Sequence, residues 1–340
     1  MEEYLVVRAH GLKLRFLKPE DYARLLGATS IREFFNILSS TDYSGSIEGL
    51  RWEKIGLEDF FKVVFNKYVE RVELISGYAP SELGRLLQTY ALGRYELINL
   101  KRALRAKALG ERIEIEDLCP VELHIHLNEL VEAEGLEELL YMLRSRGYRY
   151  ASKMYDVYVT SGFLGTIECG LEADYYSSLY EMLKEVATAE GVREILDIEA
   201  DLRWLYWCIV FKFKNLKLTR VMTPLRAMGR ELSERIGPYI EEAYLSDIPA
   251  LVAQVVRFRD LEEALSRAIR EEDYVLIDHA LSSKLYREAY RVMRRDFVSL
   301  AYVFAFILAC EMEMRNLNAI FTGKKVGLPS SEIQRFLFTY

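Results

Sequence analysis

Apolar residues recur along this chain at three- and four-residue spacing over long stretches. One stripe consists of Val64, Tyr68, Val72 and Ile75, and another of Leu179, Met182, Leu183 and Val186. This period places the apolar side chains on one face of an α-helix. Proline and glycine, which interrupt helices, number only 7 and 19 in 340 residues. The pattern therefore predicts an all-α protein.

Strand-like alternation occurs only in two short pieces, Arg112 to Glu116 and Val121 to Leu127. Each is compatible with a strand or with an extended connection, and neither predicts a sheet. The longest nearly uncharged run, Phe297 to Cys310, is 14 residues long, and a bilayer needs about 20. It predicts a fully buried helix, and we expect no transmembrane segment. Acids near the N-terminus, where a signal peptide would be basic, argue against secretion.

A pattern of apolar residues ended by a tyrosine occurs more than once. It consists of Ile31, Phe34, Phe35, Leu38 and Tyr43, and a shift of 105 turns it into Leu136, Leu139, Leu140, Leu143 and Tyr148. A shift of 217 gives Ile248, Leu251, Val252 and Val255, with Asp260 in place of the tyrosine. Internal repetition of this kind determines the fold class, so it takes precedence over local patterns.

A second marker repeats at the same distance. Asn99-Leu100-Lys101 shifted by 217 becomes Asn316-Leu317-Asn318, while Glu96 coincides with Glu313 and Gly110 with Gly327. In the middle copy, a shift of 102 gives Asp201-Leu202-Arg203, with Ile198 at the position of the glutamate. Two unrelated markers that share one offset are poorly explained by ordinary amphipathicity.

Prolines mark where these copies are joined. Cys119-Pro120 and Thr223-Pro224 interrupt the helical pattern. We therefore expect three similar helical copies over residues 1–117, 118–222 and 223–340. Three such copies joined by short links can close into a ring-like or funnel-shaped body with a central hollow.

Charge and cysteine content exclude several classes of function. The formal net charge is −7, which gives no overall basic field for nucleic acid. The four cysteines, Cys119, Cys169, Cys208 and Cys310, lie far apart, so buried reduced thiols are expected rather than disulfides or a zinc site. No glycine-rich phosphate loop is present, and Gly323-Lys324-Lys325 predicts a basic turn after a helix. We expect no cofactor.

Few residues suggest chemistry. His124 and His126 would share a strand face with Glu122, as metal ligands can, but a polar face is the simpler interpretation. Ser330 or Ser331 is expected to cap a last helix. Arg94, Lys101 and Arg105, with Arg102 beside them, would form a basic helix face. That face is either solvated or a contact for an acidic partner.

Three segments resemble one protein family. They are LSSTDY at Leu38–Tyr43, RYELINLKRALRAK at Arg94–Lys107 and EMRNLNAIFTGKKVGLPSSEI at Glu313–Ile333. Together they resemble the C subunit of archaeal-type (A/V-type) rotary ATPases, the counterpart of the d subunit of eukaryotic V-ATPases. The likeness covers nearly the whole chain. The middle copy departs from it at Asp201-Leu202-Arg203 and at the aromatic residues Trp204, Trp207 and Phe211.

The resemblance implies a non-catalytic socket of three helical subdomains, arranged with pseudo-threefold symmetry into a funnel with a central cavity. Its mouth would receive the rotor shaft made by the D and F subunits, and its base would rest on the membrane proteolipid ring. The complex would move H⁺ or Na⁺. The socket would be peripheral, on the cytoplasmic face of the membrane, with no metal, cofactor or nucleic acid.

Polar residues repeated at one position of each copy are the candidates for lining the cavity and binding the shaft. They are Glu96, Asn99, Lys101, Arg105, Asp201, Arg203, Glu313, Arg315 and Asn316. The same residues could instead pair with one another inside the protein. A generic helical scaffold for other proteins and an α-helical enzyme with an unrecognised site are the alternative functions.

Overall fold

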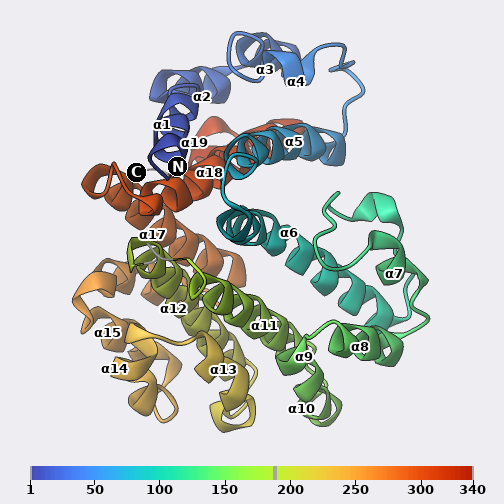
Figure 1. Ribbon diagram of the computed structural model, residues 1–340, viewed down its shortest axis with the longest axis vertical. Coiled ribbons are helices and arrows are strands. Elements are labelled where there is room, and N and C mark those ends of the chain that lie inside the picture. Colours follow the sequence, from blue (N-terminus) through green and yellow to red (C-terminus); the bar gives the residue numbers. More distant parts are fainter. Residues whose placement is uncertain (1, 187–189, 339–340) are drawn as a thin grey trace. The chain divides into compact units, whose positions relative to one another are not determined.

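The computed structural model describes residues 2–186 and 190–338, and all regular structure in these ranges is helical (Figure 1). This confirms the all-α prediction. Neither short alternating piece forms a strand: Ile115–Asp117 is a single 3₁₀ turn, η1, and residues 121–126 are irregular. Within the same ranges, no helix combines the length and the apolar character needed to cross a membrane.

The chain folds as two compact lobes. The split lobe comprises residues 1–87 and 286–340, and the continuous lobe comprises residues 88–285. Helices of the split lobe are α1 (Glu2–Lys13), α2 (Pro19–Gly27), α3 (Ile31–Leu38), α4 (Ser44–Ile47), α5 (Leu57–Ser76), α18 (Leu300–Lys325) and α19 (Ser330–Gln334). Two helices belong to both lobes, α6 (Ser81–Leu109) and α17 (Tyr274–Arg295). The boundaries proposed for the three copies remain a prediction.

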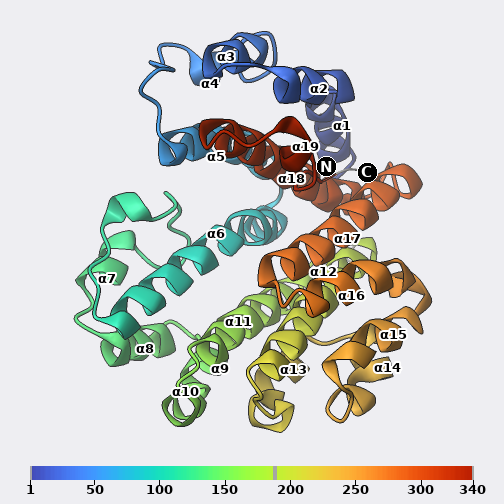
Figure 2. The same cartoon turned by 180° about the vertical axis from the view of Figure 1, so that it is seen from behind.

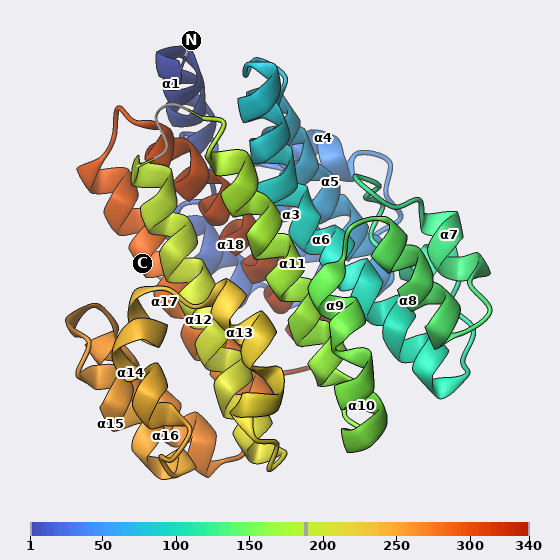
Figure 3. The same cartoon turned by 60° about the horizontal axis from the view of Figure 1, so that its bottom comes forward.

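The continuous lobe contains the remaining helices. They are α7 (Leu127–Glu132), α8 (Leu136–Ser145), α9 (Arg149–Lys153), α10 (Tyr155–Ser161), α11 (Gly165–Leu183), α12 (Glu190–Phe213), α13 (Met222–Met228), α14 (Glu231–Ile240), α15 (Ile248–Ala253) and α16 (Glu262–Arg270). Short 3₁₀ turns η2 (Leu218–Val221), η3 (Leu245–Asp247) and η4 (Val256–Leu261) connect them. Figure 3 shows α14, α15 and α16 lying together as one group of short helices.

The split lobe is built on the packing of α5 against α18, which lie side by side in Figure 1 and Figure 2. Short helix α3 covers the pair and begins after Ser30, whose hydroxyl accepts a hydrogen bond from the Glu33 amide at 3.1 Å. Phe34 of α3 lies against Phe60, and Phe60 stacks on Phe321 of α18 with ring centroids 4.1 Å apart. These rings form the aromatic core of the lobe.

The continuous lobe is centred on α11, most of whose side chains are buried. Short helix α9 packs closely across it, and the closest approach is at Gly170. A β-carbon at this position would lie 2.6 Å from the Cα and the amide nitrogen of Ala151, which are rigid main-chain atoms. Only glycine therefore allows the two helices to approach this closely.

Replacing Gly170 with alanine is expected to lower the free energy of unfolding by about 1–3 kcal/mol, because the new methyl group overpacks the contact. Urea denaturation followed by circular dichroism measures the change. Gly11 on α1 is the matched control, since a β-carbon there meets no atom within 4 Å. Gly11→Ala should stabilise the protein by about 1 kcal/mol through helix propensity. Equal effects of the two variants would contradict the close contact.

The three long helices α6, α12 and α18 end in the same way. Each is followed by a residue in the left-handed conformation, namely Gly110 with φ 69°, Asn215 with φ 53° and Gly327 with φ 77°. The next amide then bonds back to the helix, from Glu111 to the Ala106 carbonyl at 2.8 Å, from Leu216 to Phe211 at 2.9 Å and from Leu328 to Gly323 at 2.8 Å. This is a Schellman-type ending. Asparagine takes the place of glycine in the middle copy.

Two local predictions were wrong. The buried helix expected from Phe297 begins only at Leu300, and Phe297 and Val298 are exposed. The last helix α19 begins after Pro329, so Ser330 lies in its first turn and is not its cap. The Ser330 hydroxyl donates instead to the Leu26 carbonyl at 2.6 Å. The four cysteines are free and buried, as predicted.

Candidate functional site

Three acidic side chains of the long helices are buried in the protein. They are Glu96 on α6, Asp201 on α12 and Glu313 on α18, and each is at most 3% exposed. All three were predicted to line a cavity. A buried carboxylate is unfavourable unless hydrogen-bond donors surround it, and each of these carboxylates has such donors.

Glu313 collects donors from three segments of the split lobe. Its Oε1 accepts from the Tyr43 hydroxyl at 2.9 Å and from Arg71 Nη1 at 2.6 Å, and its Oε2 accepts from the Leu17 amide at 2.6 Å. Burial raises the pKa of Tyr43, so its phenol remains a donor. Tyr43 ends the LSSTDY motif, and the motif therefore serves to bind a buried carboxylate.

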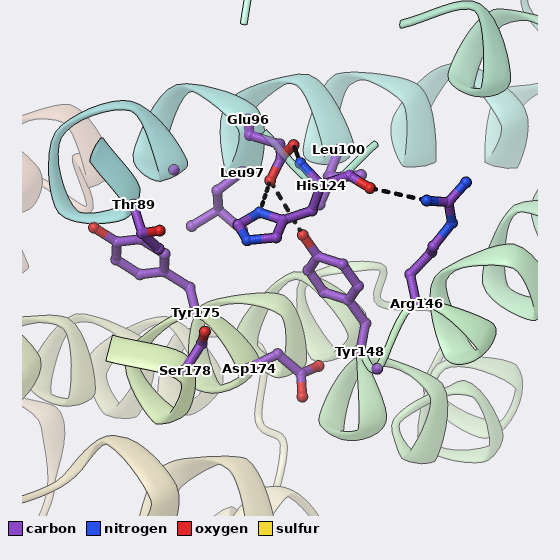
Figure 4. A pocket seen from close by; sticks show the side chains of 12 residues that line it. Thr89, Glu96, Leu97, Leu100, His124, Arg146, Tyr148, Asp174, Tyr175 and Ser178 are labelled. Atoms are coloured by element: carbon purple, nitrogen blue, oxygen red, sulfur yellow. Dashed lines mark hydrogen bonds and ion pairs between the residues drawn. The ribbon is translucent and has the colours of Figure 1, made fainter. Parts of the chain in front are cut away.

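Glu96 performs the same task in the continuous lobe (Figure 4). Its Oε1 accepts from the amides of Leu123, His124 and Ile125 at 3.0, 2.7 and 3.1 Å. Its Oε2 lies 2.8 Å from His124 Nδ1 and 3.4 Å from the Tyr148 hydroxyl. Tyr148 is the residue that the shift of 105 matches to Tyr43. The pairing of a long-helix glutamate with this tyrosine thus occurs in both lobes.

Asp201 holds the start of α14. Its carboxylate accepts from the amides of Arg230 and Leu232 at 2.7 and 2.9 Å, and from that of Ser233 at 3.4 Å. Although these bonds favour the charged form, burial raises the pKa of Asp201 to about 6. The aspartate fixes the beginning of a short helix, much as Glu96 fixes the segment before α7.

A lysine follows each of these acids by 11 residues on the same helix. Three helical turns separate the members of each pair, so both lie on one face. Lys107 Nζ donates to the Val131 carbonyl at 2.7 Å, Lys212 to Ala243 at 2.6 Å and Lys324 to Leu26 at 2.8 Å. The Val131 and Leu26 carbonyls lie at the C-terminal ends of α7 and α2, where helices leave acceptors unsatisfied. Ala243 follows the end of α14 by three residues, and Lys212 also donates to the Glu241 carbonyl directly after that helix, at 3.0 Å.

We call each acid–lysine pair a clamp, which gives Glu96/Lys107, Asp201/Lys212 and Glu313/Lys324. The clamps correct the alignment of the middle copy. Asp201 corresponds to Glu96 at a shift of 105, the same shift as the tyrosine marker, rather than to Asn99 at 102. Asn215 agrees, because it matches Gly110 at 105. Lys324 of the Gly-Lys-Lys sequence therefore ends a helix and caps another.

Asn99 and Asn316 have a related role. The side chain of Asn99 bonds to both main-chain groups of Cys119, at 2.7 and 2.8 Å, and the side chain of Asn316 bonds to both main-chain groups of Phe338, at 2.8 and 3.0 Å. Each asparagine thus ties the segment after its own helix back onto that helix. Five of the nine predicted site residues are therefore buried and bonded within the protein.

Three predicted cations meet at α11 in what we call the charged cluster, formed by Lys101, Arg105, Glu168, Glu172, Arg203 and Asp278. Glu172 accepts from Arg203 Nη2 at 2.7 Å and from Trp207 Nε1 at 2.8 Å, and it also pairs with Lys101. Burial alone would raise its pKa, but the charges of Arg203 and Lys101 lower the pKa of Glu172 to about 2. Arg203 reaches Asp278 at 2.9 Å as well.

Arg105 is the most exposed member of the charged cluster. Its guanidinium makes two parallel bonds to Glu168, at 2.6 and 2.9 Å, yet 59% of its side chain is exposed. Arg94 pairs with Glu199 at 3.2 Å, so the basic face of α6 is largely paired within the protein rather than solvated. Arg315 belongs to the split lobe, and its Nη1 donates to the Tyr286 hydroxyl at 3.2 Å.

The acids Glu168 and Glu172 were missed in the sequence. They stand 63 and 71 residues from Arg105 and Lys101, and no local pattern marks them as partners. The clamp lysines could have been predicted from the sequence, because each follows its acid by the same 11 residues. A search for paired charges at a fixed distance would have found them.

A pocket of about 120 Å³ lies beside Glu96 (Figure 4). His124, Tyr148 and Asp174 line it, and the hydrogen bond to Glu96 raises the pKa of His124. His126 points elsewhere and pairs with Glu122 at 3.3 Å. In the ranges that the structure covers, no group of three or more histidine, cysteine or acidic residues is arranged to hold a metal ion.

The arrangement is that of an all-helical protein in which charged side chains serve packing and contact. Comparison with known proteins identifies the family to which this helical protein belongs. Residues 5–336 match the ATP synthase (C/AC39) subunit family, and the chain belongs to that family. The family is an accessory, structural component of the synthase rather than a catalytic one. The resemblance read from the three sequence segments is confirmed.

Individual relatives are named as the C subunit of an A-type ATP synthase. The protein of Thermoplasma volcanium is 22% identical over 94% of this chain and 92% of its own length. Those of Haloquadratum walsbyi and Methanosarcina mazei are 23% and 24% identical, over 98% and 97% of this chain and 97% and 91% of their own lengths. The chain is thus a rotary ATPase subunit.

Proposed function

We propose that this protein is the central-stalk socket that couples the rotating shaft of the D and F subunits to the membrane proteolipid ring. It sits at the cytoplasmic face of the membrane as a peripheral component and transmits torque for H⁺ or Na⁺ transport. The observation that carries the proposal is the family match over residues 5–336. A socket needs no active site, and it needs stiffness.

The internal bonding supports the required stiffness. Each clamp fixes a short helix at both ends of an 11-residue span, and buried charge-assisted bonds of this kind are the strong ones. Dense helical packing deforms little under load. A body built in this way passes rotation on with little loss to internal bending.

The proposal is tested by binding. The purified chain, a purified complex of the D and F subunits from the same organism and the detergent-solubilised proteolipid ring are mixed in pairs and all together. The proposal expects the chain to bind each partner and to join the two into one complex on size exclusion. Failure of the chain to bind the D–F complex or the ring would reject the socket function.

Arg105 offers a test of how the shaft is held. Arg105→Gln should weaken D–F binding about three- to tenfold, with a smaller effect at high salt, because an exposed rim charge acts mainly on association. Arg235→Gln is the matched control, since Arg235 is 62% exposed and pairs with Glu231 at 3.2 Å. Titration by surface plasmon resonance at two ionic strengths measures both. Unchanged affinity in Arg105→Gln would remove the charged cluster from the shaft interface.

A further inference from the structure

Helix α1 is apolar on two opposite sides. One side, with Leu5, Val6, Ala9 and Leu12, is buried, and α1 packs on α18 and α5. The other side exposes Tyr4, Val7 and Leu14, and the last two are 68% and 84% exposed. Leu14 follows the helix directly, and its amide still donates to the His10 carbonyl at 3.3 Å. A second apolar side on a helix is a surface that a partner can cover.

The exposed residues have the spacing of a helix-pairing seam. Positions 4, 7, 11 and 14 alternate steps of three and four, which is the repeat of the apolar positions that face a partner helix in a coiled coil. Position 11 is a glycine, and no atom lies within 4 Å of the place where its β-carbon would be. The seam is therefore open at Val7, Gly11 and Leu14 and narrowest at the glycine, whereas Tyr4 at its start packs on Tyr78 with ring centroids 5.6 Å apart and keeps 49% of its surface exposed.

Basic residues flank this seam on both sides. Arg8 and Arg15 lie on one flank, in the positions that select the charge of the partner helix. His10 and Lys13 lie on the other. Arg8 donates to the Leu74 carbonyl and to the Tyr4 hydroxyl and lies over the Tyr78 ring, so it contributes a fixed positive charge beside the seam. Within the described ranges, Arg15 has no side-chain partner, and the Lys13 ammonium lies over the rings of Tyr290 and Tyr302 at 5.5 and 5.9 Å rather than beside an acid.

Acids on α1 are confined to its first turn, at Glu2 and Glu3, where negative charge complements the helix dipole. The flanks of the seam beyond that turn are thus basic on a chain whose net charge is −7. This local excess favours an acidic partner.

We propose that the seam formed by Tyr4, Val7, Gly11 and Leu14 binds an acidic helix of the rotor shaft. This inference rests on the proposed socket function and adds a contact surface that lies outside the charged cluster. The partner helix carries apolar residues at three- and four-residue spacing and acids beside them, which pair with Arg15. The spacing favours a helix over a lipid surface, because a bilayer does not require one narrow stripe.

The test uses the full chain and the purified D–F complex as the probe. Val7→Asp with Leu14→Asp should weaken binding at least about tenfold, since a charge placed in an apolar seam removes its central contacts. Val326→Asp is the control, because Val326 is 61% exposed in the same lobe but away from α1 in sequence. Urea denaturation should show unchanged folding of both variants. Arg15→Glu should weaken binding most at low salt.

The outcomes separate the two proposals. A wild-type chain that does not bind the D–F complex overturns the socket function. A wild-type chain that binds, together with a Val7→Asp/Leu14→Asp variant that binds equally well, overturns the seam alone. Vesicles containing anionic phospholipid provide a second arm. If the double variant loses vesicle binding and keeps shaft binding, the seam is a lipid contact and this inference is wrong.

Discussion

Replacing Glu313 with alanine is expected to lower the free energy of unfolding by about 3–5 kcal/mol, the usual result of removing one partner from a buried ion pair. The carboxylate is 1% exposed and accepts from Tyr43, Arg71 and Leu17. Without it, the buried Arg71 guanidinium keeps its charge and loses its closest acidic partner, while Asp42 at 3.1 Å still pairs with it. The segments held together at this point belong to α18, α5 and the two connections around α2 and α3.

Chemical denaturation monitored by circular dichroism measures the loss as a lower midpoint with an unchanged slope. Glu73→Ala is the control, because Glu73 lies exposed on α5, the helix of Arg71, and should change stability by no more than about 0.5 kcal/mol. A joint Arg71→Met and Glu313→Leu variant removes both charges and should recover much of the loss. An effect of Glu313→Ala as small as that of the control would show that the buried pair does not hold the split lobe.

Glu172→Gln should destabilise the continuous lobe at neutral pH and change its response to acid. The pKa of Glu172 falls from 4.5 to about 2 in the folded protein, a difference on the order of 3 kcal/mol. Because the folded pKa is the lower one, this stabilisation is fully present above pH 4.5 and is lost as the pH falls from 4.5 towards 2. Glutamine cannot titrate, so the variant lacks this loss.

The measurement is the free energy of unfolding of both proteins at several pH values between 3 and 7. Asp174 and Asp201 act in the opposite direction in both proteins, because burial raises the pKa of each to about 6. Their contribution cancels in the difference between wild type and variant. That difference should be largest at pH 7 and shrink below pH 4.5. A difference independent of pH would mean that the charges of Lys101 and Arg203 do not control Glu172.

The sequence predicted the helical class because that class depends on the spacing of apolar residues. Gly110 and Gly327 were matched correctly, since only a few residue types tolerate the left-handed conformation that ends these helices. Asn215 was missed because asparagine is a different residue type that also adopts the left-handed conformation. The three positions share a backbone conformation with positive φ, and that shared conformation, rather than the residue type, makes them equivalent.

The middle copy was placed three residues out of register for a similar reason. Asp201 was matched to Asn99 by its neighbour Leu202, although it replaces Glu96, and a carboxylate on a shorter side chain can accept from main-chain amides as well. Alternation in residues 121–127 suggested a strand, but the amides of Leu123, His124 and Ile125 are turned towards one carboxylate. A single distant acceptor can organise a segment that local propensity leaves open.

The predicted site residues fall into two groups, one buried and bonded within the protein and one exposed, and the sequence does not show which residue belongs to which group. A polar residue repeated on a long helix can bond to unsatisfied main-chain groups of a neighbouring segment. In that case its role lies inside the protein. Glu96 and Asn316 are buried and have this internal role, whereas most of the Arg105 side chain is exposed to solvent. Which of the two applies depends on partners 20 to 296 residues away, such as Cys119 and Leu17.

The three clamps have a consequence for how the polypeptide is connected. Helix α6 grips α7, α12 grips α14, and α18, the last long helix, grips α2, which is among the first. The bond from Lys324 on α18 to the Leu26 carbonyl on α2 spans 298 residues, so it fastens the C-terminal part of the split lobe to its N-terminal part. Because the chain runs through the whole continuous lobe between these two segments, the split lobe is closed on itself by a contact between distant parts of the sequence.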